Sequence, residues 1–283
     1  MNIYDMVTEK ILRELETGTV PWRRPWIAEG GRNGLPINWQ TKKPYRGINT
    51  LLLNPGEYLT YKQAQGAGGH VKAGEHGHKI IFWTMIDRER EGADGEREKF
   101  PLLRYYTVFE VSQCEGIIRR YPPEDPKGKD PFTPIEKAEE IISMYTDPPE
   151  IVHENGDGAF YLPQRDRVQV PAKESFSSPH GYYSTLFHEL THSTGHKRRL
   201  DRPGITDNQG FGSDSYAFEE LVAELGAAFL SGTAGIDQTT IPNSAAYIDG
   251  WSKQLRQEKT WMVRAAGQAQ KAADYIQGIQ YGE

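Results

Sequence analysis

The first eighteen residues carry apolar positions at helical spacing with charged residues between them: Ile3, Met6, Val7, Ile11 and Leu15. This spacing predicts an amphipathic helix at the start of the chain. The pattern differs from the uninterrupted apolar core of a signal peptide, so we expect no export signal in this segment.

Two apolar runs, residues 79–83 and 102–111, are rich in β-branched and aromatic residues and predict strands. The charged, glycine-containing stretch Asp87–Lys99 lies between them and predicts the exposed loop of a long β-hairpin. A short helix is expected around Leu59–Ala67. The N-terminal part is therefore expected to combine helices with a small sheet.

The pattern changes after residue 134, where a proline followed by an apolar stripe predicts a helix. Residues 159–171 predict two short strands around a turn. Three helical regions follow: one through residues 182–194, one over roughly 216–230, and a pair from about 244 to 279.

Prolines and charges fill Arg119–Pro134, a composition that excludes regular structure and predicts a linker. A chain of 283 residues is long enough for two domains that each bury a core. We therefore predict an α+β fold with an N-terminal domain at residues 1–125 and a second domain at residues 126–283.

Composition indicates a polar chain: 25% of the residues are charged, the mean hydropathy is −0.68, and no apolar run has the length of a membrane span. We expect a bacterial cytoplasmic protein without a membrane partner, and the single Cys114 excludes an internal disulfide. The charge is uneven. Basic residues exceed acidic ones by 11 to 7 in residues 1–83, whereas acidic residues exceed basic ones by 21 to 13 in residues 131–283.

The segment TLFHELTHSTGH, residues 185–196, contains the pattern H-E-x-x-H. Residues four apart project from nearly the same helix face, so His188 and His192 can direct ring nitrogens at one metal ion. Glu189 lies beside the first histidine, where it can act as the base for a water bound to the metal. The surrounding apolar positions predict the helix that this pattern needs, and a short sheet with such a helix packed on it is the layout of a zincin.

A catalytic zinc usually has three protein ligands, so a third is needed. Glu220 and Glu224 share one face of the predicted helix downstream; Glu220 is the favoured ligand, and Glu224 is the alternative or an acceptor that orients a ligand histidine. Without a metal, both would be ordinary exposed glutamates. His196 competes for the third position, but Gly195 directly before it leaves its ring little room to return to the metal. We therefore expect His196 at the end of the helix or in contact with a ligand residue. Glu219 is expected to face solvent.

Three tyrosines near these helices, Tyr182, Tyr183 and Tyr216, are candidate hydrogen-bond donors to a transition state or, alternatively, packing residues.

Aromatic and basic residues interleave in the N-terminal part without strand or heptad regularity. Bases stack on aromatic rings while lysine and arginine contact phosphates, so this mixture is typical of proteins that bind single strands. The alternative is that the tryptophans form the core of a small domain and the charges an ordinary surface. The candidate DNA-binding residues are Trp22, Arg23, Arg24, Trp26, Trp39, Lys42, Lys43, Tyr45 and Arg46.

The sequence resembles the ArdC-type antirestriction proteins of conjugative plasmids through nearly its whole length. The N-terminal segments that carry the resemblance are PWRRPW, YRGIN, LTYKQAQGAGGHVKAGEHG and IIFW. The C-terminal segments are FHELTHSTGHKRRLDR, YAFEELVAELGAAFL and AQKAADYI, and they are the more specific. The charged loop at Asp87–Lys99 and the acidic C-terminal part are where this chain departs from the family pattern.

The resemblance implies an N-terminal domain that binds single-stranded DNA, a zincin-like metallopeptidase domain, and protection of incoming plasmid DNA from host restriction. It implies a divalent metal, zinc first and manganese as the alternative, held by His188, His192 and Glu220, with Glu189 as the catalytic glutamate. The spacing of Glu220 with Ala223 and Ala227 is also similar to the third-ligand helix of ImmA/IrrE metallopeptidases.

Two alternatives follow for function. The chain could act only by coating DNA, with a metal ion that is structural and not catalytic. It could instead be an ImmA/IrrE-like regulatory peptidase whose N-terminal domain binds protein. The expected partners are single-stranded DNA and, for a peptidase, a protein substrate; the sequence identifies neither that substrate nor an oligomeric state.

Overall fold

The computed structural model describes residues 2–23, 34–89, 97–120, 133–154, 158–206, 214–236 and 245–279. Most of the predicted linker and the predicted boundary between residues 125 and 126 lie outside the described residues, as do Arg24 and Trp26. Helices combined with small sheets confirm the α+β class.

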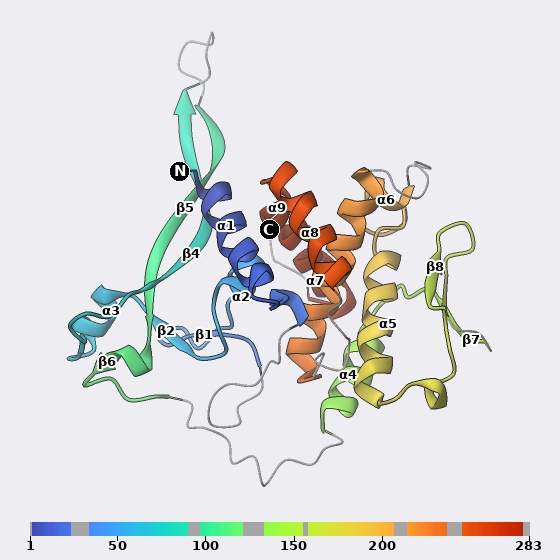
Figure 1. Cartoon of the computed structure of the whole chain (residues 1–283), viewed down its shortest axis with the longest axis horizontal. Helices are drawn as coiled ribbons and strands as arrows, with labels where there is room; N and C mark the ends of the chain where they lie inside the picture. The colour runs from blue at the N-terminus through green and yellow to red at the C-terminus, as the bar shows by residue number, and fades with distance from the viewer. Residues whose placement is uncertain are drawn as a thin grey trace.

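The N-terminal part contains short helices and a four-stranded sheet (Figure 1). Its helices are α1 (Ile3–Glu16), α2 (Ile48–Leu52) and α3 (Tyr61–Gly66), with the 3₁₀ turns Pro21–Arg23 and Val111–Gln113. Its strands are β1 (Ile37–Asn38), β2 (Glu57–Leu59), β3 (His70–Val71), β4 (His78–Glu89), β5 (Arg97–Glu110) and β6 (Cys114–Glu115). The sheet order is β1-β2-β5-β4, and β3 pairs separately with β6.

The long hairpin predicted from the two apolar runs is confirmed. Strands β4 and β5 pair from His78 opposite Val108 to Glu89 opposite Arg97. Both strands continue into the stretch expected to be a loop, because the backbone hydrogen bonds of an antiparallel pair do not depend on particular side chains. Only residues 90–96 lie between the described ends of the two strands.

The C-terminal part packs helices on a three-stranded sheet. Its helices are α4 (Thr133–Ser143), α5 (Pro179–Ser193), α6 (Pro203–Thr206), α7 (Asp214–Ala234), α8 (Ala245–Gln257) and α9 (Trp261–Ile276), with a 3₁₀ turn at Lys173–Ser175. Its strands are β7 (Glu150–His153), β8 (Phe160–Leu162) and β9 (Arg167–Val170), in the order β7-β9-β8. The sequence pattern predicted the antiparallel pair β8 and β9 but not β7, which joins β9 in parallel.

Helix α1 belongs to the same hydrophobic core as the C-terminal helices. Figure 1 shows it between the β4–β5 hairpin and the helices α8 and α9. Its Val7, Ile11 and Leu15 are at most 1% exposed and lie in one cluster with residues of α5, α7 and α9. The largest core therefore includes residues from both sides of the predicted boundary, and the boundary itself stays a prediction.

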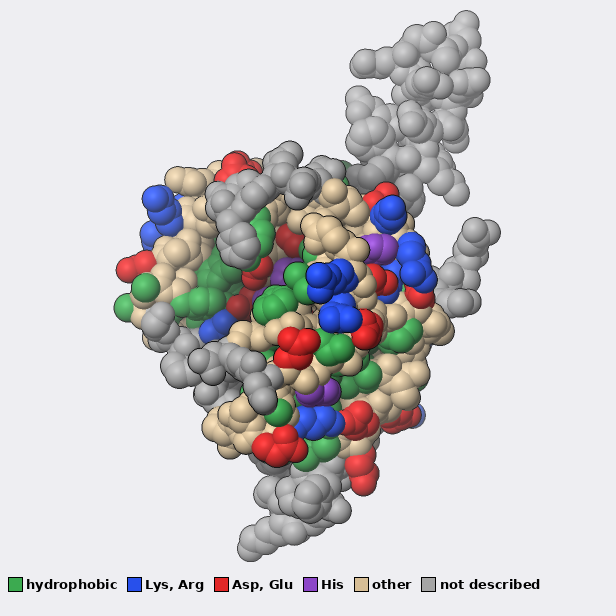
Figure 2. Space-filling model, turned by 90° about the vertical axis from the view of Figure 1, so that its right-hand side faces the viewer, with side chains coloured by type: hydrophobic (Ala, Val, Ile, Leu, Met, Phe, Trp, Pro, Cys, Tyr) green, Lys and Arg blue, Asp and Glu red, His purple; other side chains and the backbone are tan. Residues whose placement is uncertain are grey.

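The surface at the right of Figure 1 faces the viewer in Figure 2, where acidic and basic side chains are interspersed with hydrophobic ones. Neither sign of charge dominates the described part of this face. Among the described residues, no helix combines the length and apolar character needed to cross a membrane.

Helices α5 and α7 approach each other closely at Gly226. A side-chain carbon at this glycine would lie 2.6 Å from the hydroxyl oxygen of Thr191, which is fully buried on α5. Protein interiors are packed as densely as crystals, so there is no free volume for such a group. The glycine therefore sets how near the two helices lie.

We expect Gly226→Ala to lower the free energy of unfolding by about 1–3 kcal/mol, because the added methyl group overpacks the contact with Thr191. The matched control is Gly267→Ala on α9, where the added carbon would meet nothing within 4 Å. The control should be neutral or stabilise by up to about 1 kcal/mol, since alanine is the better helix former. Urea unfolding measures both; equal effects of the two substitutions would contradict the packing argument.

Candidate metal centre

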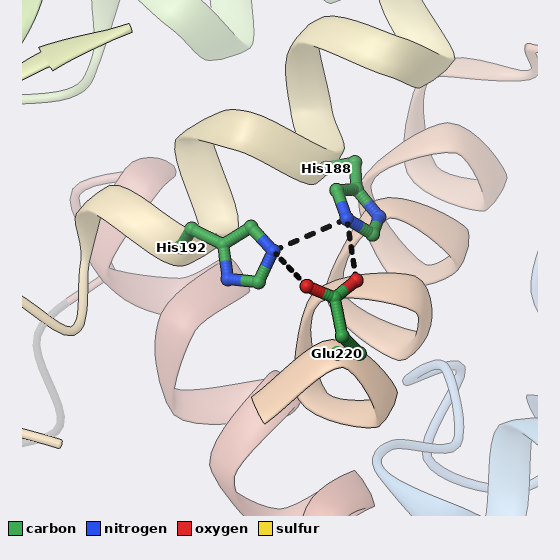
Figure 3. Close-up of side chains that lie close together, drawn as sticks. All are labelled: His188, His192 and Glu220. Atoms are coloured by element: carbon green, nitrogen blue, oxygen red, sulfur yellow. Dashed lines mark hydrogen bonds and ion pairs between the residues drawn. The ribbon is translucent and has the colours of Figure 1, made fainter. Parts of the chain in front are cut away.

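Helix α5 brings two histidines of the H-E-x-x-H motif together. The helix starts with Pro179 after Ser178, whose hydroxyl oxygen accepts a hydrogen bond from the Gly181 N–H at 3.1 Å. Proline fits the first helical position and serine caps the N-terminus. One turn apart on this helix, His188 and His192 have their Nε2 atoms 3.2 Å from each other (Figure 3).

Glu220 of α7 completes a cluster with the two histidines. Its carboxylate oxygens lie 3.5 Å from the Nε2 of His188 and 3.5 Å from the Nε2 of His192. Donor atoms at the corners of a tetrahedron with bonds of about 2.0–2.1 Å are roughly 3.3–3.4 Å apart. The three separations match this edge length, and the set of two imidazoles and one carboxylate suits a divalent ion. These residues could therefore hold a metal.

The charges around the cluster favour a cation. Burial alone would lower the pKa of His188, but the hydrogen bond to Glu220 and the charges of Glu224 and Glu189 raise it to about 9. Burial would likewise raise the pKa of Glu220, yet its hydrogen bond to His188 and the nearby histidine charges lower it to about 2. Three carboxylates thus surround His188, and positive charge at the cluster is stabilised.

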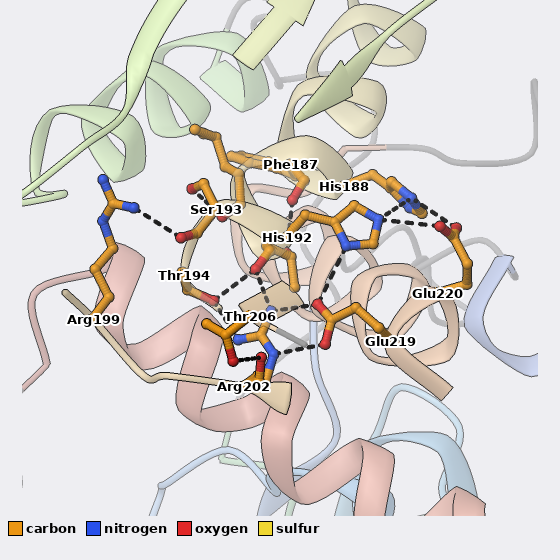
Figure 4. A network of polar contacts seen from close by, with 12 residues as sticks. Phe187, His188, His192, Ser193, Thr194, Arg199, Arg202, Thr206, Glu219 and Glu220 are labelled. Carbon is orange, nitrogen blue, oxygen red and sulfur yellow. Dashed lines mark hydrogen bonds and ion pairs between the residues drawn. The ribbon is translucent and has the colours of Figure 1, made fainter. Parts of the chain in front are cut away.

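Glu219 does not face solvent as expected; it is 2% exposed and lies behind His192 (Figure 4). Its Oε1 is 3.2 Å from the Nδ1 of His192. Arg202, which is 4% exposed, donates to both oxygens of Glu219, at 2.9 Å from Nε and 2.6 Å from Nη2. The prediction for Glu219 was wrong because α7 is buried on most of its circumference, including the side that carries this residue.

The pairing with Arg202 keeps Glu219 ionised. Burial would raise the pKa of Glu219, but the hydrogen bonds and charge of Arg202 lower it below its usual value. An ionised carboxylate only accepts hydrogen bonds, so the Nδ1 of His192 must donate its proton to it. That tautomer leaves the lone pair of Nε2 directed at Glu220 and His188, as in the carboxylate–histidine–metal arrangement of zinc sites.

Of the three candidates for the third ligand, the structure brings only Glu220 to the histidines among the residues that it describes. His196 lies in the turn after α5, where its Nδ1 accepts a hydrogen bond from the backbone N–H of Arg198. Glu224 is bound instead to Arg23 at 2.7 Å, and no bond between it and a ligand histidine is found among the described contacts. The residue that orients a histidine is Glu219.

A cavity of about 260 Å³ opens beside the cluster. Glu189, which is 7% exposed, lines it together with His188. The other lining residues are Arg23, Ala159, Ser184, Thr185, Glu224 and Ala227. The motif glutamate therefore borders a space next to a candidate ligand, where a substrate group and a water could meet.

The three tyrosines occupy different surroundings. Tyr216 forms a hydrogen bond with Glu220, and burial together with that contact raises its pKa. The Tyr182 hydroxyl bonds to His153 and the Tyr183 hydroxyl to Glu139, away from the candidate ligands. Tyr216 is thus the tyrosine that the structure places at the cluster.

Most of the aromatic candidates for DNA binding are buried. Trp22 is 0% exposed and donates its indole N–H to Tyr247, while Trp39 is 8% and Tyr45 is 5% exposed. In this conformation these rings have no open face on which a base could stack. The packing alternative therefore describes their surroundings better.

The basic candidates divide into paired and exposed residues. Arg23 is bound to Glu224, and Arg46 is bound to Asp274 of α9. Lys42 and Lys43 lie exposed in the turn after β1.

Two family models match the chain. Residues 1–109 match the N-terminal domain of the anti-restriction factor ArdC, and residues 136–268 match a zincin-like metallopeptidase. A crystal structure of the antirestriction protein ArdC from plasmid R388, in a metal-free form, is 35% identical and has a TM-score of 0.78. The Mn(II)-bound form of that protein is 33% identical with a TM-score of 0.75, and in both cases 98% of this chain and 97% of the other are covered.

Curated relatives extend over the same region. The uncharacterised protein y4eC of Sinorhizobium fredii (strain NBRC 101917 / NGR234) is 34% identical over 99% of this chain and 92% of its own length. Two Escherichia coli proteins named DNA primase TraC are each 34% identical over 96% of this chain, which spans only 20% and 27% of their lengths. The name primase therefore describes proteins of which this chain matches a minor part.

We expect Glu219→Gln to weaken metal affinity about 10- to 100-fold, the usual cost of losing a partner that orients a metal-binding histidine. The neutral amide accepts a weaker hydrogen bond from His192. The substitution also removes the negative charge that neutralises Arg202. Competition with a chromophoric chelator for zinc or manganese measures the affinity, and circular dichroism verifies folding. Glu140→Gln, an exposed carboxylate on α4, is the control. Equal affinities of the two variants would show that Glu219 does not orient the site.

Proposed function

This chain belongs to the ArdC antirestriction family, and on that premise we propose that it binds single-stranded DNA and carries a metal-dependent peptidase site that together protect incoming plasmid DNA from restriction. The resemblance read from its motifs is confirmed by relatives that align over nearly the whole chain. A zincin-like domain and a Mn(II)-bound relative indicate a divalent metal.

The observation that supports the peptidase site is the grouping of His188, His192 and Glu220 beside a cavity bordered by Glu189. We infer that the first three residues hold the ion, with zinc as the first choice and manganese, as in the R388 relative, as the alternative. Such an ion, when bound, polarises a carbonyl and lowers the pKa of a water.

The chain's own residues would then move the protons. The carboxylate of Glu189 accepts a proton from the attacking water and passes it to the nitrogen of the leaving amine. The ionised Glu219 keeps His192 in the tautomer that presents Nε2. The Tyr216 hydroxyl, already at Glu220, is a hydrogen-bond donor near the reacting groups.

Glu189→Gln tests the peptidase role. We expect the variant to bind metal as the parent does but to lose peptide hydrolysis by at least about 100-fold, because an amide cannot accept the water's proton. Metal-loaded protein and a library of quenched fluorescent peptides give the rate, and Glu140→Gln is the control with a matched charge change. Undiminished hydrolysis by Glu189→Gln would exclude this role.

The same variant separates hydrolysis from DNA protection. Conjugative transfer into a restricting host measures protection directly. Protection lost with Glu189→Gln makes hydrolysis part of the mechanism, whereas full protection by this variant means that DNA binding suffices.

The DNA-binding role predicts preference for single strands over duplex and a strong dependence on salt. Each phosphate contact to a single strand lowers the slope of log K against log salt by about 0.7. Fluorescence anisotropy with labelled single-stranded and double-stranded oligonucleotides, over a range of salt concentrations, measures both properties. Binding that ignores salt, or that is equal for duplex, would argue against this role.

A further inference from the structure

The β4–β5 hairpin exposes aromatic rings that have no packing partner in the core. Five of the six exposed aromatic side chains among the described residues lie on these strands or at the start of α3: Tyr61, Phe82, Trp83, Tyr105 and Tyr106. They are between 44% and 57% exposed. Large apolar side chains that gather on a protein surface often mark a binding site.

Two of these rings share one face of the hairpin. Ile80 is paired with Tyr106, and Phe82 is paired with Arg104, so alternate residues place Phe82 and Tyr106 on the same side. Their ring centroids are 5.8 Å apart, with an angle of 71° between the planes. Tyr105, the neighbour of Tyr106, points to the opposite side, where Lys79 lies 4.9 Å from its ring.

A cavity of about 430 Å³ lies along the face of Phe82 and Tyr106, and we name it the Phe82–Tyr106 groove. Its floor includes the buried Ile80 and Val108. The remaining lining residues are Asn38, Tyr45, Thr60, Gln63, Trp83 and Thr84. The groove thus combines exposed rings with amide and hydroxyl groups, the two kinds of contact that an unpaired base can use.

Gln63 offers a hydrogen-bond donor in this groove. Its Oε1 accepts a hydrogen bond from the backbone N–H of Thr60 as part of the cap of α3, at 2.8 Å. That bond fixes the orientation of the amide, and within the described part of the chain its Nε2 has no partner. A base edge with an acceptor can therefore bind there.

Basic residues neighbour the lining residues of the groove along the chain or across the strand pair. Lys42 and Lys43 lie in the turn that starts at Asn38, Lys62 precedes Gln63 on α3, and Arg104 is on the same face as Phe82. All four are exposed, and no carboxylate pairs with them among the residues that the structure describes. The groove lining also contains no acidic residue. This charge is complementary to phosphate, in contrast to the mixed surface of Figure 2.

We propose that the Phe82–Tyr106 groove is where the chain binds unpaired bases of single-stranded DNA, with the neighbouring basic residues holding the phosphates. This assignment rests on the proposed DNA-binding function and gives it a location. Stacked, paired bases in a duplex present only their edges, so the exposed rings can be used only by single strands. In this proposal the bases stack on the exposed rings of the hairpin and not on Trp22 and Trp39, which are buried.

The test is fluorescence anisotropy of the full chain with a labelled oligothymidylate. Phe82→Ala and Tyr106→Ala should each weaken binding about 5- to 100-fold, the loss associated with one base stack. Tyr105→Ala is the matched control, because it removes a ring of similar exposure, 53% against 45% for Tyr106, from the opposite face of the same strand. Tyr106→Phe keeps the ring and should bind as the parent does. Melting temperatures verify that the surface substitutions leave the fold intact.

Salt dependence separates the stacking of bases from the binding of phosphates. Lys42→Ala combined with Lys43→Ala should reduce the salt slope by roughly 0.7 for each phosphate that the protein no longer neutralises, whereas Phe82→Ala should leave the slope unchanged.

The outcomes distinguish the groove from the general function. If the parent binds the oligonucleotide and Phe82→Ala, Tyr106→Ala and Tyr105→Ala all bind equally well, the groove assignment is wrong while the DNA-binding function stands. If the parent does not bind single strands, both are wrong.

Discussion

The close approach of α5 to α7 is the constraint on which the candidate metal centre depends. Two of its residues come from one helix and the third from the other, so the distance between the helices determines the distances between the donor atoms. Gly226 permits the approach. The hydrogen bonds that link Arg202, Glu219 and His192 fix how each helix is rotated about its own axis. Because the arginine also donates to the backbone oxygen of Thr191, it holds both helices through one buried side chain. The protein's own contacts therefore set the spacing of the three candidate ligands.

The N-terminal segment takes part in the same region. Arg23 lies 3.9 Å above the ring of Tyr247 and pairs with Glu224, with side chains only 12% and 16% exposed. Trp22 beside it is packed against Trp251 and bonded to Tyr247. A positive charge near Glu224 offsets one of the three carboxylates around His188, so the N-terminal segment moderates the electrostatic field of the cavity.

The sequence was sufficient for the parts of the site that depend on local spacing. Four-residue spacing on a helix determines which residues share a face, so His188 and His192 could be proposed as a ligand pair without coordinates. It could not separate Glu220 from Glu224, which share a face, and the choice of Glu220 also drew on the resemblance to the third-ligand helix of ImmA/IrrE metallopeptidases. Glu219 was missed because the pattern of exposed and buried faces gives no information on a helix that is buried on most sides. Arg202 was missed because it reaches the site through a turn, and no periodicity relates a turn residue to a distant carboxylate. For the aromatic candidates, the sequence indicates which rings are present but not which of them are buried in the core, and the fold buries Trp22 while leaving Tyr106 exposed.

Helix α1 has a further consequence for how this fold is inherited. Its apolar face completes the core of the C-terminal helices, so neither region matched by a family model keeps its packing surface when the other is removed. A gene that acquired only one of the two regions would encode a protein with an uncovered core. The two TraC proteins agree with this requirement, because each contains a counterpart of 96% of this chain, both regions together, inside a much longer polypeptide. In these two relatives the regions therefore occur side by side, the arrangement that a core shared between them favours.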